Sequence, residues 1–304
     1  MMRAHEIRIL FTTRDPSDDA TDDSSEFDGY GDEDDDDFMQ QKIMGGERVE
    51  KGEIPWAVLL IFPGNLCGGT LISRRHILTA AHCFTKEGRG FGNCSVSNML
   101  PMDSVKKIGV FVGGTCIRAG TSNCTSGDTG ERHKIARAYY KGYFERGCKG
   151  THDIAVLELS EDVSAAINHI CLPFMDQVME IEDPYLKLKS FGWGLDPLNF
   201  PQTLLPMHLQ KLDSGSMMSE KKCSRLKIFE AKDTFCTNQS KDKHICIGDS
   251  GGGVTAKIEG RYYLIGIHSY GTDCGKVLEA KLPAVQINTD VSYYKTLIKS
   301  WIQL

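Results

Sequence analysis

From Ile43 onwards the sequence is built of short apolar runs, rich in β-branched and aromatic residues, that are separated by turn-forming residues. Runs of this length and spacing are typical of the strands of an all-β sandwich or barrel. We therefore predict an all-β domain over residues 43–304. Strands are expected at Trp56–Phe62, Gly69–Ser73, His76–Ala81, Ile108–Gly114, Asp153–Leu159, Gly252–Ile258 and Arg261–Ser269.

One clear helix is predicted, at the end of the chain. Apolar residues recur there at helical spacing: Val291, Tyr294, Leu297, Ile298, Trp301 and Leu304. The stretch from about Phe84 to Gly150 is long and irregular, so we expect enlarged surface loops in it.

Charge is sharply segregated along the chain. Residues 1–42 hold 14 acidic side chains against 4 lysines and arginines, a net charge of −10, whereas the whole chain carries −6, which leaves +4 on residues 43–304. The acidic segment has too few aliphatic residues to offset the entropy lost on ordering, and it is predicted to be disordered. We therefore divide the chain into residues 1–42 and residues 43–304.

Cysteine content and glycosylation sequons indicate a secreted protein. The chain has 11 cysteines and Asn-x-Ser/Thr triplets at Asn93, Asn123 and Asn238, which is typical of an oxidising compartment. No apolar run reaches the ~18 residues of a membrane span. Residues 1–12 lack the apolar centre of a signal peptide, so we expect the natural start to lie upstream.

Three short motifs contain groups suited to acyl transfer: LTAAHC with His82, DIAVLEL with Asp153 and GDSGGG with Ser250. Acyl transfer needs a nucleophile, a base that takes its proton and a carboxylate that orients the base. Each residue also has an ordinary structural interpretation. His82 beside Cys83 could be a zinc ligand or a core histidine. Asp153 could cap a strand, and Ser250 could be a turn serine.

With these motifs in the order His, Asp, Ser, the chain from Ile43 to about Trp301 closely resembles the chymotrypsin/trypsin family of serine endopeptidases. The resemblance implies two six-stranded antiparallel β-barrels with the active site in the cleft between them. It implies His82 as general base, Asp153 as the residue that orients it, and Ser250 as nucleophile. The backbone N–H groups of Gly248 and Ser250 would form the oxyanion hole.

The resemblance also implies that the chain is a zymogen. Cleavage after Lys42 would free the α-amine of Ile43, which would pair with Asp249 and order the oxyanion hole. Residues 1–42 would then be the propeptide. Asp249 needs such a partner, because an unpaired carboxylate packed behind the serine costs several kcal/mol.

Two other functions are compatible with parts of the sequence. Residues 248–252 formally fit the G-x-S-x-G elbow of α/β-hydrolases, but the glycines after Ser250 oppose the helix that the elbow requires, and the His and Asp motifs precede the serine. The alternative from a different class is a non-catalytic protease homologue that acts by binding.

By resemblance, three disulfides are expected: Cys67–Cys83, Cys223–Cys236 and Cys246–Cys274. The family's bridge from the propeptide to Cys171 cannot form within this chain, because residues 1–42 contain no cysteine. Cys171 would then pair within the inserted region or stay free. No pairing is assigned to Cys94, Cys116, Cys124 and Cys148.

The specificity pocket departs from trypsin. Its floor, six residues before Ser250, is His244 rather than aspartate, so a preference for Lys or Arg is not expected. Ser269, Tyr270 and Gly271 align with the pocket wall, and Gly271 leaves the entrance open. An open uncharged pocket would take aromatic or large aliphatic side chains, whereas a protonated His244 would favour acidic ones. In a third interpretation His244 is a solvated loop residue.

No cofactor or metal is expected. The stretch GGTCIRAGTSN, which aligns with trypsin's calcium loop, offers no carboxylate. There is no phosphate-binding glycine loop and no basic stripe for nucleic acid, and no membrane partner is expected. The expected partners are a protein or peptide substrate, an activating trypsin-like protease and protease inhibitors.

Overall fold

The computed structural model describes residues 45–63, 65–86, 95–117, 119–120, 124–148, 150–178, 183, 185–194, 208–224, 231–238, 240, 243–246, 248–272, 274–279 and 285–302. The chain divides into two units, Met1–Gln40 and Gln41–Leu304, and all described residues belong to the second. The predicted disorder of the acidic segment and the junction between Lys42 and Ile43 lie outside the described residues.

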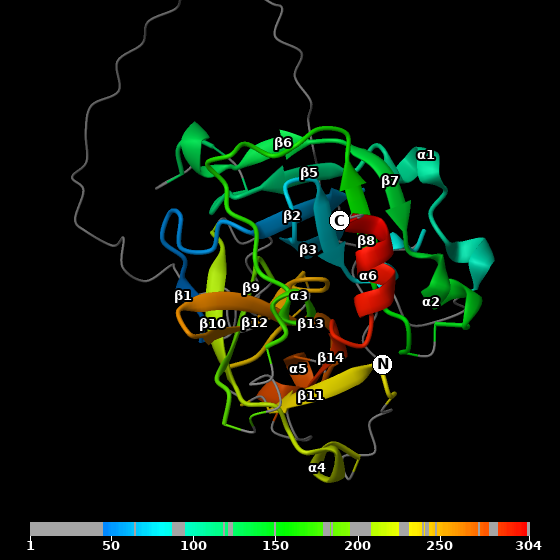
Figure 1. The fold of residues 1–304 in the computed structure, drawn as a ribbon, viewed down its shortest axis with the longest axis vertical. Coiled ribbons are helices and arrows are strands. Elements are labelled where there is room, and N and C mark those ends of the chain that lie inside the picture. Colours follow the sequence, from blue (N-terminus) through cyan, green and yellow to red (C-terminus); the bar gives the residue numbers. More distant parts are fainter. Residues whose placement is uncertain are drawn as a thin grey trace, which may run out of the picture. The chain divides into compact units, whose positions relative to one another are not determined.

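The first sheet has the strand order β6-β5-β2-β3-β4-β8-β7, with every pair antiparallel. Its strands are β2 (Ala57–Phe62), β3 (Asn65–Leu71), β4 (His76–Thr79), β5 (Gly109–Val112), β6 (Glu131–His133), β7 (Ile135–Tyr139) and β8 (Ala155–Leu159). The two edge strands, β6 and β7, are separated along the chain only by Lys134. Because one nearly continuous stretch forms both edges, this sheet curls round into a barrel (Figure 1).

The second sheet has the order β1-β10-β9-β12-β13-β14-β11 and is also antiparallel. Its strands are β1 (Glu47–Arg48), β9 (Leu188–Gly192), β10 (Gln210–Gly215), β11 (Thr234–Asn238), β12 (Gly253–Ile258), β13 (Arg261–Gly271) and β14 (Val285–Asp290). The two-residue strand β1 joins the edge through Glu47, which lies opposite Lys211.

The predicted all-β class with two antiparallel sheets and a C-terminal helix is confirmed. Each sheet has seven strands rather than the expected six. In the first sheet the extra strand arises because Lys134 divides one stretch into β6 and β7. In the second it is the short edge strand β1. The underlying six-stranded pattern is therefore retained in both sheets.

The helices are short. They are the 3-10 helices η1 (Ala81–Phe84), η2 (Val96–Asn98) and η3 (Ser126–Asp128), and the α-helices α1 (Met102–Val105), α2 (Lys141–Glu145), α3 (Pro173–Asp176), α4 (Glu220–Ser224), α5 (Cys274–Leu278) and α6 (Lys295–Ile302). The stretch from Phe84 to Gly150 contains β5, where a strand was expected at Ile108–Gly114, and also β6, β7 and short helices, which were not expected. Among the described residues, no helix has the length and apolarity needed to cross a membrane.

The C-terminal helix α6 begins at Lys295, four residues later than the periodicity predicted. The reason is a turn at Asp290, whose side chain accepts hydrogen bonds from the backbone N–H of Ser292 at 2.8 Å and of Tyr293 at 3.4 Å. The helix packs beside the first sheet (Figure 1), where the Trp301 ring lies 6.4 Å from that of Tyr139.

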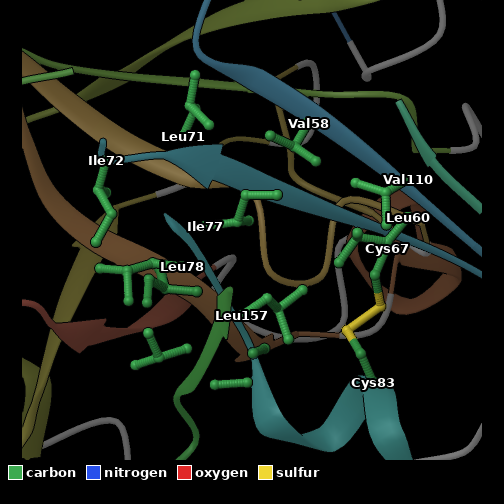
Figure 2. Close-up of a cluster of buried hydrophobic side chains, with 14 of the residues drawn as sticks. Val58, Leu60, Cys67, Leu71, Ile72, Ile77, Leu78, Cys83, Val110 and Leu157 are labelled. Atoms are coloured by element: carbon green, nitrogen blue, oxygen red, sulfur yellow. A yellow bond between two sulfur atoms is a disulfide. The ribbon is translucent and has the colours of Figure 1, made fainter. Parts of the chain in front are cut away.

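The first barrel is filled by aliphatic side chains from all its central strands. Figure 2 shows side chains of β2, β3, β4, β5 and β8 converging, with the Cys67–Cys83 disulfide at the edge of the cluster. Residues on β2 and β3 are almost all buried, because one side of these strands faces the barrel interior and the other is covered by neighbouring chain. This disulfide ties the helical turn η1 to β3.

The disulfides among the described residues are Cys67–Cys83, Cys116–Cys124, Cys223–Cys236 and Cys246–Cys274. Three are the pairs that the resemblance implies. Cys116–Cys124, which had no assigned pairing, closes the stretch that aligns with the calcium loop. Cys148 is also disulfide-bonded, and Cys171 is a half-buried free thiol.

We expect Leu60→Ala to lower the free energy of unfolding by about 3 kcal/mol, because the truncation leaves a cavity in the first barrel. Leu60 is completely buried, whereas its neighbour Ile61 on the same strand is only partly buried. Ile61→Ala is the matched control and should cost less than half as much. Equal losses for the two variants in urea unfolding would contradict this account of the core.

Candidate active site

His82 and Asp153 are brought together by two elements of the first sheet. His82 lies on η1, directly after β4, and Asp153 lies two residues before β8. The ring nitrogen Nδ1 of His82 donates to Asp153 Oδ2 at 2.7 Å, and the backbone N–H of His82 donates to Asp153 Oδ1 at 2.8 Å. This two-point contact fixes the tautomer of the ring, with the proton on Nδ1, and leaves Nε2 to act as a base.

Residues of the second sheet complete the surroundings of Asp153. The hydroxyl of Ser269, on β13, donates to Asp153 Oδ2. The hydroxyl of Thr289, on β14, donates to the backbone carbonyl of Asp153 at 2.9 Å. Ser269 was expected in the wall of the specificity pocket, and its hydroxyl is directed to this carboxylate.

The pKa values of this pair move in opposite directions. Burial opposes the charge on His82, but attraction to the Asp153 carboxylate outweighs it and raises the His82 pKa above the usual histidine value. Burial also opposes the charge on Asp153, yet His82 and the hydrogen bond from Ser269 hold the Asp153 pKa below its usual range. The aspartate is therefore ionised wherever the histidine works as a base.

The loop that carries Ser250 is held by hydrogen bonds from both sheets. The backbone N–H of Gly68, on β3, donates to the carbonyl of Ser250 at 2.7 Å. On the other side, Gly251 N–H donates to the His268 carbonyl, and His268 N–H donates to the Gly252 carbonyl, both at 2.9 Å. The carbonyl of Ser250 is also 3.9 Å from the sulfur of Cys83, the residue next to His82. The backbone of Ser250 therefore lies close to the residue that follows His82 in the chain.

Gly248 and Asp249 form the turn before the serine. Gly248 has φ +99°, a conformation that only glycine adopts readily. The Asp249 carboxylate is completely buried and accepts hydrogen bonds from Gly194 N–H at 2.7 Å and Cys246 N–H at 3.0 Å.

Two glycines make room for this carboxylate, and the sequence motifs do not include them. A Cβ atom at Gly192 would lie 2.0 Å from Asp249 Oδ1, and one at Gly194 would lie 2.1 Å from Oδ2. Any other residue at either position would displace the carboxylate. The Gly-Trp-Gly run could have revealed these two positions in the sequence, because closely spaced glycines at the end of a strand mark places where another group approaches the backbone closely.

Burial raises the pKa of Asp249 to about 7, and the two backbone hydrogen bonds offset only part of this effect. This carboxyl therefore lies close to its protonation midpoint at neutral pH. A cation beside it would lower its pKa and stabilise the charged form. Ile43, which was expected to supply that cation, lies outside the described residues.

The residues assigned to the specificity pocket are His244, Ser269, Tyr270 and Gly271. His244 is completely buried rather than solvated, and its Nδ1 donates to the carbonyl of Ile245. The ring of Tyr270 packs against Gly150. Gly271, at the expected entrance, lies opposite Gln286 on β14, and a Cβ at Gly271 would lie 2.4 Å from Gln286 Oε1. The amide of Gln286 therefore covers this glycine.

Among the described residues, two groups of side chains have the composition of a metal site. Cys116, Cys124 and His208 form one, and His244, Cys246 and Cys274 form the other, with the sulfur and nitrogen atoms of each group within 4.8 Å of one another. In each group the two sulfurs are joined in a disulfide. Because the thiolate is the form that binds metals, neither pair offers a ligand while it is oxidised.

Comparisons with known proteins find one matching family model and several similar serine proteases. Residues 43–298 match the family model named Trypsin. The chain is similar to trypsin-like protease try-5 of Caenorhabditis elegans, at 34% identity over 87% of this chain and 88% of that protein. It is also similar to CLIP domain-containing serine protease B14 of Anopheles gambiae, at 27% identity over 83% of this chain and 70% of that protein. Mannan-binding lectin serine protease 1 of Homo sapiens is 27% identical over 78% of this chain and 33% of its own length.

The family match begins at Ile43, where the sequence changes from the acidic segment to the β-rich domain, and it extends into α6. It covers both sheets and all three motifs. The resemblance seen in the sequence is thereby confirmed: the chain belongs to the trypsin family of serine proteases.

Proposed function

We propose that this chain is a secreted serine endopeptidase, made as a zymogen and activated by cleavage between Lys42 and Ile43. The observation that carries the proposal is the buried Asp153 carboxylate, which accepts hydrogen bonds from His82 twice and from Ser269. A carboxylate in this state is suited to hold an imidazole with its Nε2 unprotonated. The backbone carbonyl of Ser250 lies 3.9 Å from the sulfur of Cys83, the residue next to His82, which supports Ser250 as the nucleophile.

In the proposed reaction His82 removes the proton of Ser250 as its hydroxyl attacks the scissile carbonyl. The negative charge that forms on the carbonyl oxygen is stabilised by the N–H groups of Gly248 and Ser250, each worth about 3–4 kcal/mol in such sites. His82 then protonates the leaving amine, and water releases the acyl group by the same steps. Asp153 keeps the imidazolium oriented and compensates its charge.

Activation is proposed to act on Asp249. Before cleavage, its buried carboxyl has only backbone N–H donors among the described residues, with a pKa near neutrality. A free α-amine ordinarily has a pKa of about 7.7–8, so that of Ile43 can supply a positive charge at neutral pH. Pairing would fix Asp249 in its charged form, and with it the adjacent Gly248 and Ser250 amides.

The substrate is proposed to be a protein or peptide cleaved at a residue other than Lys or Arg. A buried histidine at position 244 and the amide of Gln286 support a pocket that contains no carboxylate to attract a basic side chain. Aromatic or large aliphatic residues and acidic residues are the two substrate classes in contention. A neutral His244 would favour aromatic or large aliphatic side chains, and a protonated His244 would favour acidic ones.

Secretion and N-glycosylation are proposed from the disulfides and the sequons. Asn238 is exposed at the end of β11, as glycosylation requires. The other two sequon asparagines lie outside the described residues. Protease inhibitors and a trypsin-like activator are the proposed protein partners.

We expect Ser250→Ala to abolish peptide hydrolysis in the chain cleaved after Lys42, because the nucleophile is removed while the fold is retained. Labelling by an organophosphate probe, followed by mass spectrometry, should be lost in the same variant. Ser160→Ala, at an exposed site after β8, is the matched control and should keep both properties. Absence of labelling in correctly cleaved wild-type protein would instead favour the non-catalytic, binding homologue.

Activation should occur in trans. The purified chain is expected to stay uncut over long incubation and to gain activity after a trace of trypsin is added, since a pocket with His244 at its floor is unsuited to Lys42. Lys42→Gln should block activation by trypsin. Self-processing whose rate rises with protein concentration, and which disappears in Ser250→Ala, would contradict this prediction.

The uncut chain should lose stability through Asp249 as pH rises. The pKa of Asp249 in the folded state, about 7, lies above the ordinary aspartate value of 3.8. Between pH 3.8 and about pH 7 the folded state therefore binds a proton that the unfolded state has lost, and the free energy of unfolding falls as the pH rises through this range. A difference of about 3 between the two pKa values corresponds to roughly 4 kcal/mol. In urea unfolding, Asp249→Asn should therefore become more stable relative to wild type between pH 4 and pH 8.

Asp103→Asn, at an exposed carboxyl in the first turn of α1, is the control for the change of charge. Its stability relative to wild type should vary little over the same pH range. A flat difference between Asp249→Asn and wild type would show that the buried carboxyl does not control this pH dependence.

A further inference from the structure

We propose that Asp233 is a positioning residue for Asp153, acting through the backbone of His152. The inference rests on the proposed catalytic function of the site, and it extends that site to a carboxylate that the sequence motifs do not include. Asp233 is buried and lies directly before β11, in the second sheet, whereas His152 and Asp153 enter the first sheet.

The chain approaches Asp153 in a strained conformation. His152 has φ +58°, in the left-handed region that non-glycine residues rarely occupy. The backbone N–H of Ile154 then donates to the carbonyl of His152 at 2.8 Å, which closes a tight three-residue turn centred on Asp153. Such conformations persist only where the surrounding structure holds them in place.

Asp233 supplies that restraint. Its Oδ2 accepts a hydrogen bond from the backbone N–H of His152 at 2.7 Å and a second from the hydroxyl of Tyr294. Charge-assisted hydrogen bonds of this kind are stronger than neutral ones. The ring of Tyr294 also packs edge-on against the ring of His152, with centroids 5.6 Å apart.

Asp233 is itself fixed by its backbone. The N–H of Asp290, at the end of β14, donates to the Asp233 carbonyl at 2.9 Å. The preceding residue of β14, Thr289, donates its hydroxyl to the carbonyl of Asp153. The end of β14 therefore restrains Asp153 on one side directly and on the other through Asp233 and His152.

Two titratable side chains, His152 and Asp290, lie near enough to Asp233 to interact with its charge. The Nδ1 of His152 is 3.8 Å from Asp233 Oδ2. Burial, reinforced by Arg146, lowers the pKa of His152 despite the attraction of Asp233, so its ring is neutral at neutral pH. Burial raises the pKa of the neighbouring Asp290, and repulsion from the Asp233 carboxylate adds to this effect.

The test compares variants of the full chain after cleavage by trypsin. Asp233→Ala should lower kcat by about tenfold, with KM changed by less than about twofold, because one lost charge-assisted hydrogen bond loosens the turn at Asp153. Asp233→Asn should restore most of the activity, since both donors use the same oxygen and an amide carbonyl can accept both. Tyr294→Phe should have an intermediate effect and stays informative if Asp233→Ala does not fold.

Tyr263→Phe is the matched control for Tyr294→Phe. Tyr263 is equally buried and its hydroxyl also donates to a carboxylate, Asp176, at 3.1 Å, but neither residue contacts Asp153. The control should therefore leave kcat, KM and their pH profiles unchanged.

Two readouts separate positioning from a loss of folded protein. Loosening Asp153 weakens its support of the His82 charge, so the acid limb of the kcat/KM profile should move to lower pH in Asp233→Ala. The low-field NMR signal of the His82 Nδ1 proton should also shift or broaden in Asp233→Ala, and return in Asp233→Asn. The NMR measurement does not need turnover, so it tests this inference even if the chain proves inactive. Unchanged kcat, acid limb and proton signal in folded Asp233→Ala would overturn the proposal.

Discussion

The buried carboxylate of Asp153 is the constraint on which the arrangement of the two sheets depends. A charge removed from water costs several kcal/mol unless donors satisfy it. Here the donors come from both sheets: His82 from the first, and Ser269 from the second. The carboxylate can be satisfied only when the two sheets dock in one relative position. The same contact that stabilises the docked state therefore assembles the proposed catalytic groups.

The carboxylate of Asp249 contrasts with that of Asp153, because it is just as buried but accepts fewer hydrogen bonds among the described residues. It has two backbone donors among the described residues, and burial raises its pKa to about 7, whereas the pKa of Asp153 is held low. The difference between the two carboxyls is the presence of a cationic or polar side-chain partner. A buried carboxyl without a cationic partner among the described residues is suited to control by an event that supplies a positive charge, such as the proposed cleavage.

Much of the fold could be predicted because apolar runs indicate strands. All seven predicted runs overlap a strand. The family motifs pointed to His82 and Asp153, whose side chains are hydrogen-bonded to each other, whereas the catalytic role of Ser250 stays a prediction. Strands β9, β10 and β14, among others, escaped prediction because they mix polar and apolar residues. Their pairing is decided by the neighbouring strand rather than by their own composition. The start of α6 was misplaced because a local hydrogen bond, from the backbone N–H of Ser292 to the Asp290 side chain, competed with helical periodicity.

The less predictable part of the site consists of residues that act through backbone groups. The carboxylate of Asp233 meets an amide 81 positions away, and any residue at position 152 except proline would offer that amide. No side-chain motif can therefore reveal the pair. The one local hint is that histidine tolerates the left-handed conformation better than most residues. The turn at His152 has to bring Asp153 within reach of its hydrogen-bond donors on the second sheet. This requirement explains both the left-handed conformation of His152 and the hydrogen bond that its amide donates to Asp233. A chain without Asp233 would have to hold that turn by packing alone, and packing restrains a main-chain direction less sharply than a charged hydrogen bond does.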